Sequence, residues 1–313
     1  MKICGQRERT RMQIKGYELR GELKTTNSGF SKWGFAAKNG REYFIKEFID
    51  PVYPVCTEFL DPDMIRHKIK ICEEYEARSL CMYNKINECS DGNLAEIEEF
   101  FREGSHYYLV MEKITGVSMT LIGRQSEQDK IRICKALLHC LKSLHHAGIV
   151  HADIKLDNVI FRKLPSGKIT GKLIDFDNSF WESQPPAPDE EILGDPVYMA
   201  PETFLMMEEE EGRLTSAIDV FALGLVFHQI FTGELPQFNH EEYDYAFEAV
   251  LSGEKLIYSR EIPELWRNMI IAMTEGEVSR RITLDDAERM WKGQTTVSSN
   301  AGSGLFAAAG DLL

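Results

Sequence analysis

The chain has 313 residues, of which 43% are hydrophobic and 27% are charged. This composition is ordinary for a globular protein, and the length suits one large two-lobed domain or two ordinary domains. The net charge of −14 argues against a general nucleic-acid-binding protein, because neutralising phosphates requires a surplus of Lys and Arg.

Seven cysteines are scattered along the chain without a C-x-x-C pair, which argues against a zinc site or a disulfide framework. They predict a reducing, cytoplasmic location. The basic N-terminus lacks the apolar core of a signal peptide, and the apolar runs are too short to span a bilayer.

The first third of the chain is rich in predicted strands. They are expected at residues 18–24, 32–37, 42–48, 96–101 and 107–114. Asn39-Gly40 is the favoured turn of a two-residue β-hairpin, because both residues tolerate positive φ. Apolar residues that recur every three or four positions from Asp61 to Asn87 predict a long helix.

The rest of the chain has a mostly helical pattern. Ser126 followed by Asp129 predicts the N-terminal cap of a helix that carries a leucine stripe and stops at Gly148. Later helices are expected at residues 216–231, 243–251, 263–273 and 284–291.

The most informative segment is HADIKLDN, residues 151–158. It places an acid (Asp153), a lysine (Lys155) and an amide (Asn158) close together, and a second acid, Asp175, follows. These are the groups that phosphoryl transfer from a nucleotide requires. One acid orients or deprotonates the acceptor hydroxyl, the amide and the second acid hold Mg²⁺, and the lysine offsets charge on the γ-phosphate.

This segment resembles the catalytic loop of the eukaryotic-like (Hanks-type) serine/threonine protein kinase family. Residues 194–202, GDPVYMAPE, are similar to the end of that family's activation segment. The resemblance implies a buried ion pair between Glu202 and Arg281. It also implies that Asp219 caps backbone amides near the catalytic loop.

The resemblance covers roughly residues 17–292 and implies an α+β, two-lobed fold. A small antiparallel-sheet N-lobe would carry one main helix, and a larger C-lobe would be mostly helical. The expected boundaries are 1–16 for an N-terminal extension, 17–112 for the N-lobe, 113–293 for the C-lobe and 294–313 for a flexible tail. Loop insertions are expected at residues 48–68, 164–172 and 206–214.

The resemblance also assigns the groups that bind the nucleotide. Lys46 occupies the position of the strand lysine that contacts the α- and β-phosphates. Its expected helix partner is Glu76, chosen over Glu73 and Glu74 because Leu80, four residues later, would then face the interior.

The adenine and the phosphates have expected contacts as well. The backbone of Glu112 and Ile114 is expected to hydrogen-bond the adenine. Gly29 is the one glycine that residues 27–32 retain from the family's G-x-G-x-x-G phosphate loop.

Three residues depart from the family pattern. Asp177 replaces a Gly, and an aspartate tolerates the left-handed backbone better than most residues. Asp195 replaces a Thr and could still bind Lys155. Ala152 replaces an Arg, which predicts activity that does not depend on phosphorylation of the activation segment.

The sequence therefore predicts a kinase that uses ATP and Mg²⁺ to phosphorylate Ser or Thr of a protein substrate, with Asp153 as catalytic acid/base. Two alternatives stay open. The degenerate glycine loop, Asp177 and Asp195 fit a pseudokinase that serves as a binding module. A small-molecule phosphotransferase of the aminoglycoside-kinase kind shares the catalytic loop, but it lacks an A-P-E motif. The oligomeric state is not indicated.

Overall fold

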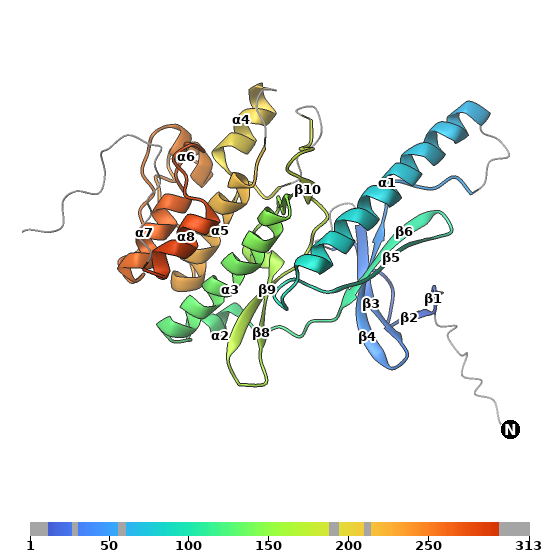
Figure 1. Ribbon diagram of the computed structural model, residues 1–313, viewed down its shortest axis with the longest axis horizontal. Coiled ribbons are helices and arrows are strands. Elements are labelled where there is room, and N and C mark those ends of the chain that lie inside the picture. The colour runs from blue at the N-terminus through green and yellow to red at the C-terminus, as the bar shows by residue number, and fades with distance from the viewer. Residues whose placement is uncertain (1–11, 27–30, 56–60, 188–193, 210–213, 294–313) are drawn as a thin grey trace, which may run out of the picture.

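The computed structural model describes residues 12–26, 31–55, 61–187, 194–209 and 214–293. Within them the chain forms a small lobe, built on a sheet and one long helix, and a larger, mostly helical lobe (Figure 1). The α+β, two-lobed fold expected from the sequence is confirmed. No helix among the described residues is long and apolar enough to cross a membrane.

The small lobe is built on a six-stranded antiparallel sheet with the order β1-β2-β3-β4-β6-β5. Its strands are Gln13–Ile14 (β1), Tyr17–Leu19 (β2), Ser31–Lys38 (β3), Arg41–Phe48 (β4), Ile97–Glu103 (β5) and His106–Glu112 (β6). Asn39 and Gly40 have φ values of 53° and 79°, as the predicted β3–β4 turn requires. The sheet begins at Gln13, inside the expected extension, because β1 pairs with β2.

The long helix α1 (Pro62–Cys89) packs against the sheet next to β5 (Figure 1). Asp61 caps its first turn by accepting hydrogen bonds from the backbone N–H groups of Asp63 and Met64. The helix buries a stripe of side chains at helical spacing, namely Cys72, Met82, Tyr83 and Ile86. This stripe fixes which face of α1 is turned toward the rest of the molecule.

The large lobe contains the other helices. They are α2 (Met119–Gly123), α3 (Glu127–His146), α4 (Pro201–Glu209), α5 (Ala217–Thr232), α6 (Ala246–Leu251), α7 (Glu264–Met273) and α8 (Leu284–Trp291). Ser126 caps α3 as predicted, because its hydroxyl oxygen accepts a hydrogen bond from the N–H of Asp129 at 3.2 Å. The four late helices expected from the sequence are present, with small shifts at their ends.

Four short strands complete the large lobe: Ile149–Val150 (β7), Val159–Lys163 (β8), Ile169–Leu173 (β9) and Phe180–Trp181 (β10). The expected loop insertion at 164–172 is partly wrong, because β9 begins at Ile169 and pairs with β8, which leaves residues 164–168 as the connection. Gly171 lets the buried β9 approach α3 closely: a Cβ there would lie 2.8 Å from Cδ2 of Leu137. The insertion expected at 206–214 is partly wrong, since α4 continues to Glu209.

Candidate active site

The catalytic loop leads from β7 to a 3₁₀ turn at Leu156–Asn158. The side-chain nitrogen of Asn158 donates to the backbone carbonyl of Asp153 and to its Oδ2, both at 2.8 Å. Nζ of Lys155 lies 3.0 Å from the same Oδ2. Burial raises the pKa of Asp153, although Lys155 and Asn158 oppose the shift. The loop therefore holds one carboxylate between an amide and an ammonium group, with a pKa shifted toward that of a useful base.

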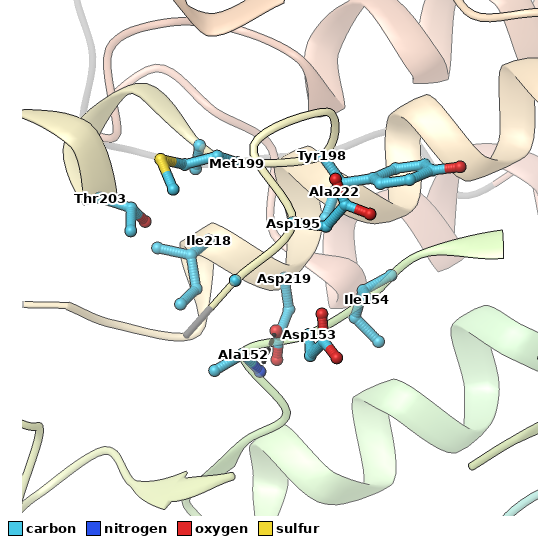
Figure 2. Close-up of a pocket in the computed structure, with 12 residues that line it drawn as sticks. Ala152, Asp153, Ile154, Asp195, Tyr198, Met199, Thr203, Ile218, Asp219 and Ala222 are labelled. Carbon is cyan, nitrogen blue, oxygen red and sulfur yellow. Dashed lines mark hydrogen bonds between the residues drawn. The ribbon is translucent and has the colours of Figure 1, made fainter. Parts of the chain in front are cut away.

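Asp219, at the start of α5, holds the backbone of this loop. Its side chain is 1% exposed, and its two oxygens accept hydrogen bonds from the N–H groups of His151 (2.7 Å) and Ala152 (2.8 Å). Ala152 has a φ of 63°, which is unfavourable for a residue other than Gly. Figure 2 shows Asp219 beside Ala152 and Asp153. Asp219 thus stabilises the strained backbone that precedes Asp153.

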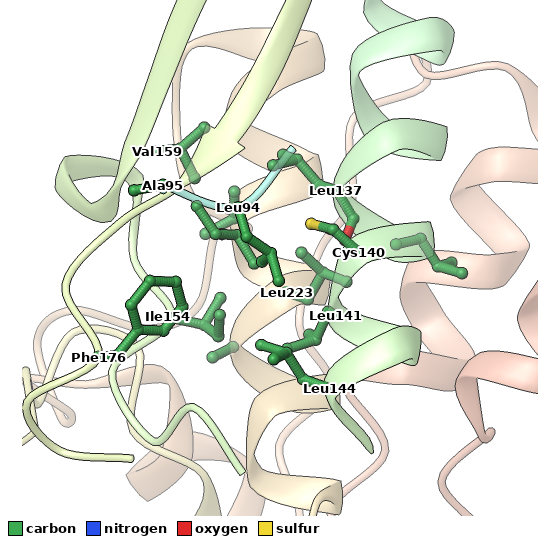
Figure 3. Close-up of a cluster of buried hydrophobic side chains, with 14 of the residues drawn as sticks. Leu94, Ala95, Leu137, Cys140, Leu141, Leu144, Ile154, Val159, Phe176 and Leu223 are labelled. Atoms are coloured by element: carbon green, nitrogen blue, oxygen red, sulfur yellow. The ribbon is translucent and has the colours of Figure 1, made fainter. Parts of the chain in front are cut away.

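The acidic segment after β9 is anchored in the large-lobe core by Phe176. This ring is buried and lies 5.2 Å from the His151 ring. In Figure 3 it lies beside Ile154 of the catalytic loop, within a cluster that α3 and α5 help to build. Asp175, and not Asp177, adopts the left-handed backbone, with a φ of 64°. The expectation of a left-handed Asp177 is therefore wrong.

Asn158 and Asp175 line the same pocket between the lobes. The nitrogen of the Asn158 amide is turned toward Asp153, so its oxygen points elsewhere. Carboxylate and amide oxygens are donors that Mg²⁺ prefers, and Mg²⁺ is commonly held by one or two such groups together with substrate phosphates. The described residues contain no cluster of three or more His, Cys, Asp or Glu able to hold a metal ion. The two predicted ligands therefore fit a magnesium ion that is shared with a nucleotide.

Lys46, on β4, lies between two acids. Its Nζ donates to Oδ1 of Asp175 and to Oδ2 of Asp177, each at 2.8 Å. The predicted pair with Glu76 is not among the ion pairs that the described residues form. Glu76 was expected because Leu80, four residues later, would face the interior. That expectation is also wrong, because Leu80 is 38% exposed and does not face the core.

The charges around Lys46 stabilise one another. Burial acts to lower the pKa of Lys46, but Asp177 and Asp175 outweigh it and raise the pKa. Burial also acts to raise the pKa of Asp175, but Lys46 holds it below the ordinary value. Burial, helped by Asp175, raises the pKa of Asp177 despite Lys46. The two acids therefore keep Lys46 protonated, and Lys46 in turn favours the carboxylate form of Asp175.

Three aromatic side chains form part of the small-lobe wall of the pocket, namely Trp33, Phe35 and Phe44. Trp33 stacks on Phe44 with ring centroids 5.8 Å apart and an interplanar angle of 20°. Sequence reasoning missed this wall. The register of the β3–β4 hairpin could have predicted it, because this register pairs Phe35 with Phe44 and Trp33 with Lys46. Ile160 and Ile174 line the large-lobe side.

Glu112 and Ile114, the expected adenine contacts, both line this pocket. The backbone N–H of Glu112 already donates to the carbonyl of Glu96 at 3.0 Å. The Glu112 carboxylate accepts hydrogen bonds from the Glu96 N–H and from Lys172 of β9. Glu112 therefore ties the end of β6 to the segment that precedes β5 and to the large lobe. Gly29 lies outside the described residues.

The Glu202–Arg281 ion pair forms with two hydrogen bonds of 2.6 and 2.9 Å. The Arg281 side chain is 1% exposed and also donates to the backbone carbonyls of Ala217 and Glu275. This pair agrees with the activation-segment resemblance and not with the small-molecule phosphotransferase alternative.

Asp195 takes a local role instead of binding Lys155. Its Oδ1 accepts the N–H of Val197 at 3.0 Å, and its carbonyl accepts the N–H of Tyr198. Among the described residues, Lys155 pairs with Asp153 and with no other acid. Figure 2 places Asp195 on the segment that faces the catalytic loop.

A protein kinase domain model matches residues 67–291, which is more than half of the chain. The chain therefore belongs to the protein kinase domain family. Its solved neighbour, the Cydia pomonella granulovirus kinase PK-1, has a TM-score of 0.62 at 18% identity, over 88% of this chain and 94% of that one. This likeness supports the two-lobed fold.

Several curated relatives are serine/threonine kinases by name. The chain is 26% identical over 283 residues to the probable serine/threonine-protein kinase fhkC of Dictyostelium discoideum, covering 87% of this chain and 43% of that protein. It is 29% identical to Arabidopsis thaliana PEPKR2 (60% and 39%) and 27% identical to human PAK 4 (63% and 31%). The matched segment thus spans less than half of each of these relatives.

Proposed function

We propose that the protein is a Ser/Thr-type protein kinase, which transfers the γ-phosphoryl group of ATP to a hydroxyl group of a protein substrate. The observation that carries this proposal is the Asp153 carboxylate, held by Asn158 and Lys155 beside a pocket that Lys46 and Asp175 also line. The names of the curated relatives support Ser/Thr specificity.

In this mechanism Asp153 takes the proton from the acceptor hydroxyl. The hydroxyl oxygen bonds to the γ-phosphorus, the bond from that phosphorus to the β-phosphate oxygen breaks, and ADP leaves. Lys155 offsets negative charge on the transferred group, and Lys46 would contact the α- and β-phosphates. Asn158 and Asp175 would hold Mg²⁺, which would supply positive charge against the nucleotide phosphates.

The adenine is proposed to bind against the aromatic wall, next to the backbone of Glu112 and Ile114. Gly29 is proposed to approach the phosphates. A cytoplasmic location is proposed as well. The five cysteines that the structure describes are free thiols, which suits a reducing compartment.

Phosphopeptide mass spectrometry after incubation with Mg²⁺ and ATP tests the proposal. The parent protein is compared with Asp153→Ala and Asp175→Asn, using a generic protein acceptor. Phosphate on Ser or Thr is expected with the parent and with neither variant. Phosphate that appears equally with Asp153→Ala would contradict the role given to this residue.

A second candidate function is nucleotide binding without transfer, as in a pseudokinase. It is favoured by the two ion pairs of Lys46, which occupy the group expected to contact the phosphates. Under this alternative, ATP would raise the unfolding temperature of the parent protein, but no acceptor would gain phosphate.

A further inference from the structure

We propose that Asp177 positions Lys46 for the nucleotide, in the place of a glutamate from helix α1. This inference rests on the proposed function, because it assigns a further role within the same site. Asp177 and Lys46 are 131 positions apart in sequence, yet Oδ2 of Asp177 lies 2.8 Å from Nζ of Lys46. Asp177 is therefore a positioning residue that acts through the lysine.

A buried ammonium group needs an acidic partner, because burial otherwise disfavours its charged form. The Lys46 side chain is 7% exposed, and among the described residues it pairs with Asp175 and Asp177. Asp175 is a proposed metal ligand, so its carboxylate would serve the cation when Mg²⁺ and a nucleotide are bound. Asp177 is then the acid that remains to hold Lys46 in place.

Helix α1 does not turn an acid toward this cluster. The α1 residues that line the pocket shared with Asp177 are Tyr75, Arg78, Ser79, Met82 and Tyr83, and Glu76 is not among them. Glu76 lies instead close enough to Tyr107 to influence the pKa of that phenol. The part of α1 that lines the pocket with Asp177 therefore carries aromatic, hydroxyl, thioether and guanidinium side chains and no acid.

Several contacts oppose a rotation of α1 that would bring Glu76 inward. The Tyr75 ring packs edge-on against the Tyr107 ring, with centroids 5.1 Å apart. The Tyr107 hydroxyl donates to the carbonyl of Cys72 at 3.1 Å. Near the end of the helix, the Asn87 side chain makes two hydrogen bonds to the backbone of Ile97, of 2.7 and 3.0 Å. Rotating α1 would break these contacts and expose its buried stripe.

The first experiment is a pair of double-mutant cycles on chemical unfolding. One cycle combines Lys46→Met with Asp177→Asn, and the other combines Lys46→Met with Glu76→Gln. A coupling of at least about threefold in the unfolding equilibrium constant is expected in the Asp177 cycle, with less in the Glu76 cycle. These cycles need no nucleotide, so they test the pair even if the protein transfers no phosphate. A larger coupling to Glu76 than to Asp177 overturns the proposal.

The second experiment measures the affinity for ADP with Mg²⁺ by calorimetry. Asp177→Asn is expected to weaken binding about tenfold or more, because one partner of a buried charge pair is lost. Asp177→Glu retains the carboxylate and should keep most of the affinity. Asp177→Gly, which introduces the family's residue, should weaken binding as much as Asp177→Asn. Glu73→Gln, at an exposed position of α1, is the matched control and should bind as the parent does.

Three outcomes separate the possible roles. If Asp177→Asn binds ADP as well as the parent, the proposal is overturned. If its defect disappears when Mg²⁺ is raised, Asp177 is a metal ligand and the proposal is also overturned. If binding depends on Asp177 but the parent phosphorylates no acceptor, the proposed kinase function fails while the role of Asp177 stands.

Discussion

In the large lobe, the groups expected to carry out phosphoryl transfer come from one loop, and Asp153 and Asn158 are five positions apart. In the small lobe, Lys46 finds its acids far along the chain, at Asp175 and Asp177. The first arrangement depends on a short backbone segment that Asp219 holds in place. The second depends on the relative placement of β4 and the segment after β9.

The two regions also differ in how closely they follow the kinase family. The family model begins at residue 67, so its match leaves out the first four strands and Lys46. Around the catalytic loop, the acids and the amide of the family pattern are kept. On the small-lobe side, the glycine loop is degenerate and an aromatic wall lines the pocket. The groups proposed for transfer thus follow the family pattern, while those proposed to hold the nucleotide depart from it.

A comparison of Asp153→Asn with Lys46→Met is the sharpest test of whether transfer and nucleotide binding depend on different groups. Asp153→Asn should lower kcat by about 10²–10⁴-fold while leaving ADP affinity close to that of the parent, because this carboxylate acts on the acceptor proton. Lys46→Met should weaken ADP binding as well, because it removes a phosphate contact. Steady-state kinetics with varied ATP and calorimetry with ADP measure both effects. Equal losses of ADP affinity in the two variants would show that the catalytic loop and the small-lobe side of the pocket do not have separate roles.

The buried ion pair of the large lobe should have the next largest effect, on stability. Glu202→Gln leaves the charge of Arg281 buried without a carboxylate, and is expected to cost about 3–5 kcal/mol of unfolding free energy. Urea denaturation measures this loss. The control is Glu277→Gln, whose exposed partner Arg280 lies 3.8 Å away, and it should change stability by no more than about 0.5 kcal/mol. Similar losses of unfolding free energy in both variants would mean that the buried Glu202 pair contributes no more to stability than an exposed pair.

Much of the large-lobe site could be predicted from the sequence because its determinants are local. The spacing of Asp153, Lys155 and Asn158 within one loop determines which groups meet. Asp219 and Arg281 lie far from the loop in sequence, but each belongs to a motif with a fixed place in the fold. The four late helices were predictable for the same reason, since the helical pattern lies within each segment.

The small-lobe side could not be predicted as well, because its contacts depend on how elements pack. The rotation of α1 decides which side chain faces the site, and the pattern that included Leu80 did not reveal it. The partner of Lys46 is set by the backbone after β9, where Asp175 and not Asp177 takes the left-handed conformation. The second part of the loop expected at 164–172 is strand, because β9 pairs with β8 and packs on α3.

Glycine substitutions test how tightly the helices of the large lobe are packed. In α5, a Cβ on Gly224 would lie 2.8 Å from Cγ2 of Thr274 and 3.0 Å from Cβ of Met273, both at the end of α7. Gly224→Ala should therefore destabilise the protein by about 1–3 kcal/mol, despite the better helix propensity of Ala. In α2, a Cβ on Gly123 would meet nothing within 4 Å, so Gly123→Ala should be neutral or stabilise by up to about 1 kcal/mol. Thermal unfolding of both variants checks the opposite signs, and a stable Gly224→Ala would contradict tight packing at this crossing.

The smallest expected effect is a pH dependence of large-lobe stability from His228. Burial lowers the pKa of His228, although the backbone carbonyl of Glu234 opposes the shift. Its Nδ1 donates to that carbonyl at 2.7 Å, and its Nε2 accepts the N–H of Ser259 at 3.2 Å, so the folded protein requires the neutral ring. The Tyr258 ring, whose centroid lies 6.1 Å away, also packs near it.

The unfolded chain takes up this proton near pH 6.5, whereas the folded chain takes it up at lower pH. The stabilisation is therefore complete above about pH 6.5 and is lost as the pH falls toward the folded pKa, with a slope of at most about 1.4 kcal/mol per pH unit. Urea denaturation between pH 7.5 and 5 should show a shallower loss for His228→Gln than for the parent. His240→Gln, at an exposed position, should follow the parent curve. If His228→Gln also follows it, the buried ring does not titrate with folding, and the acid sensitivity of the large lobe comes from its carboxylates.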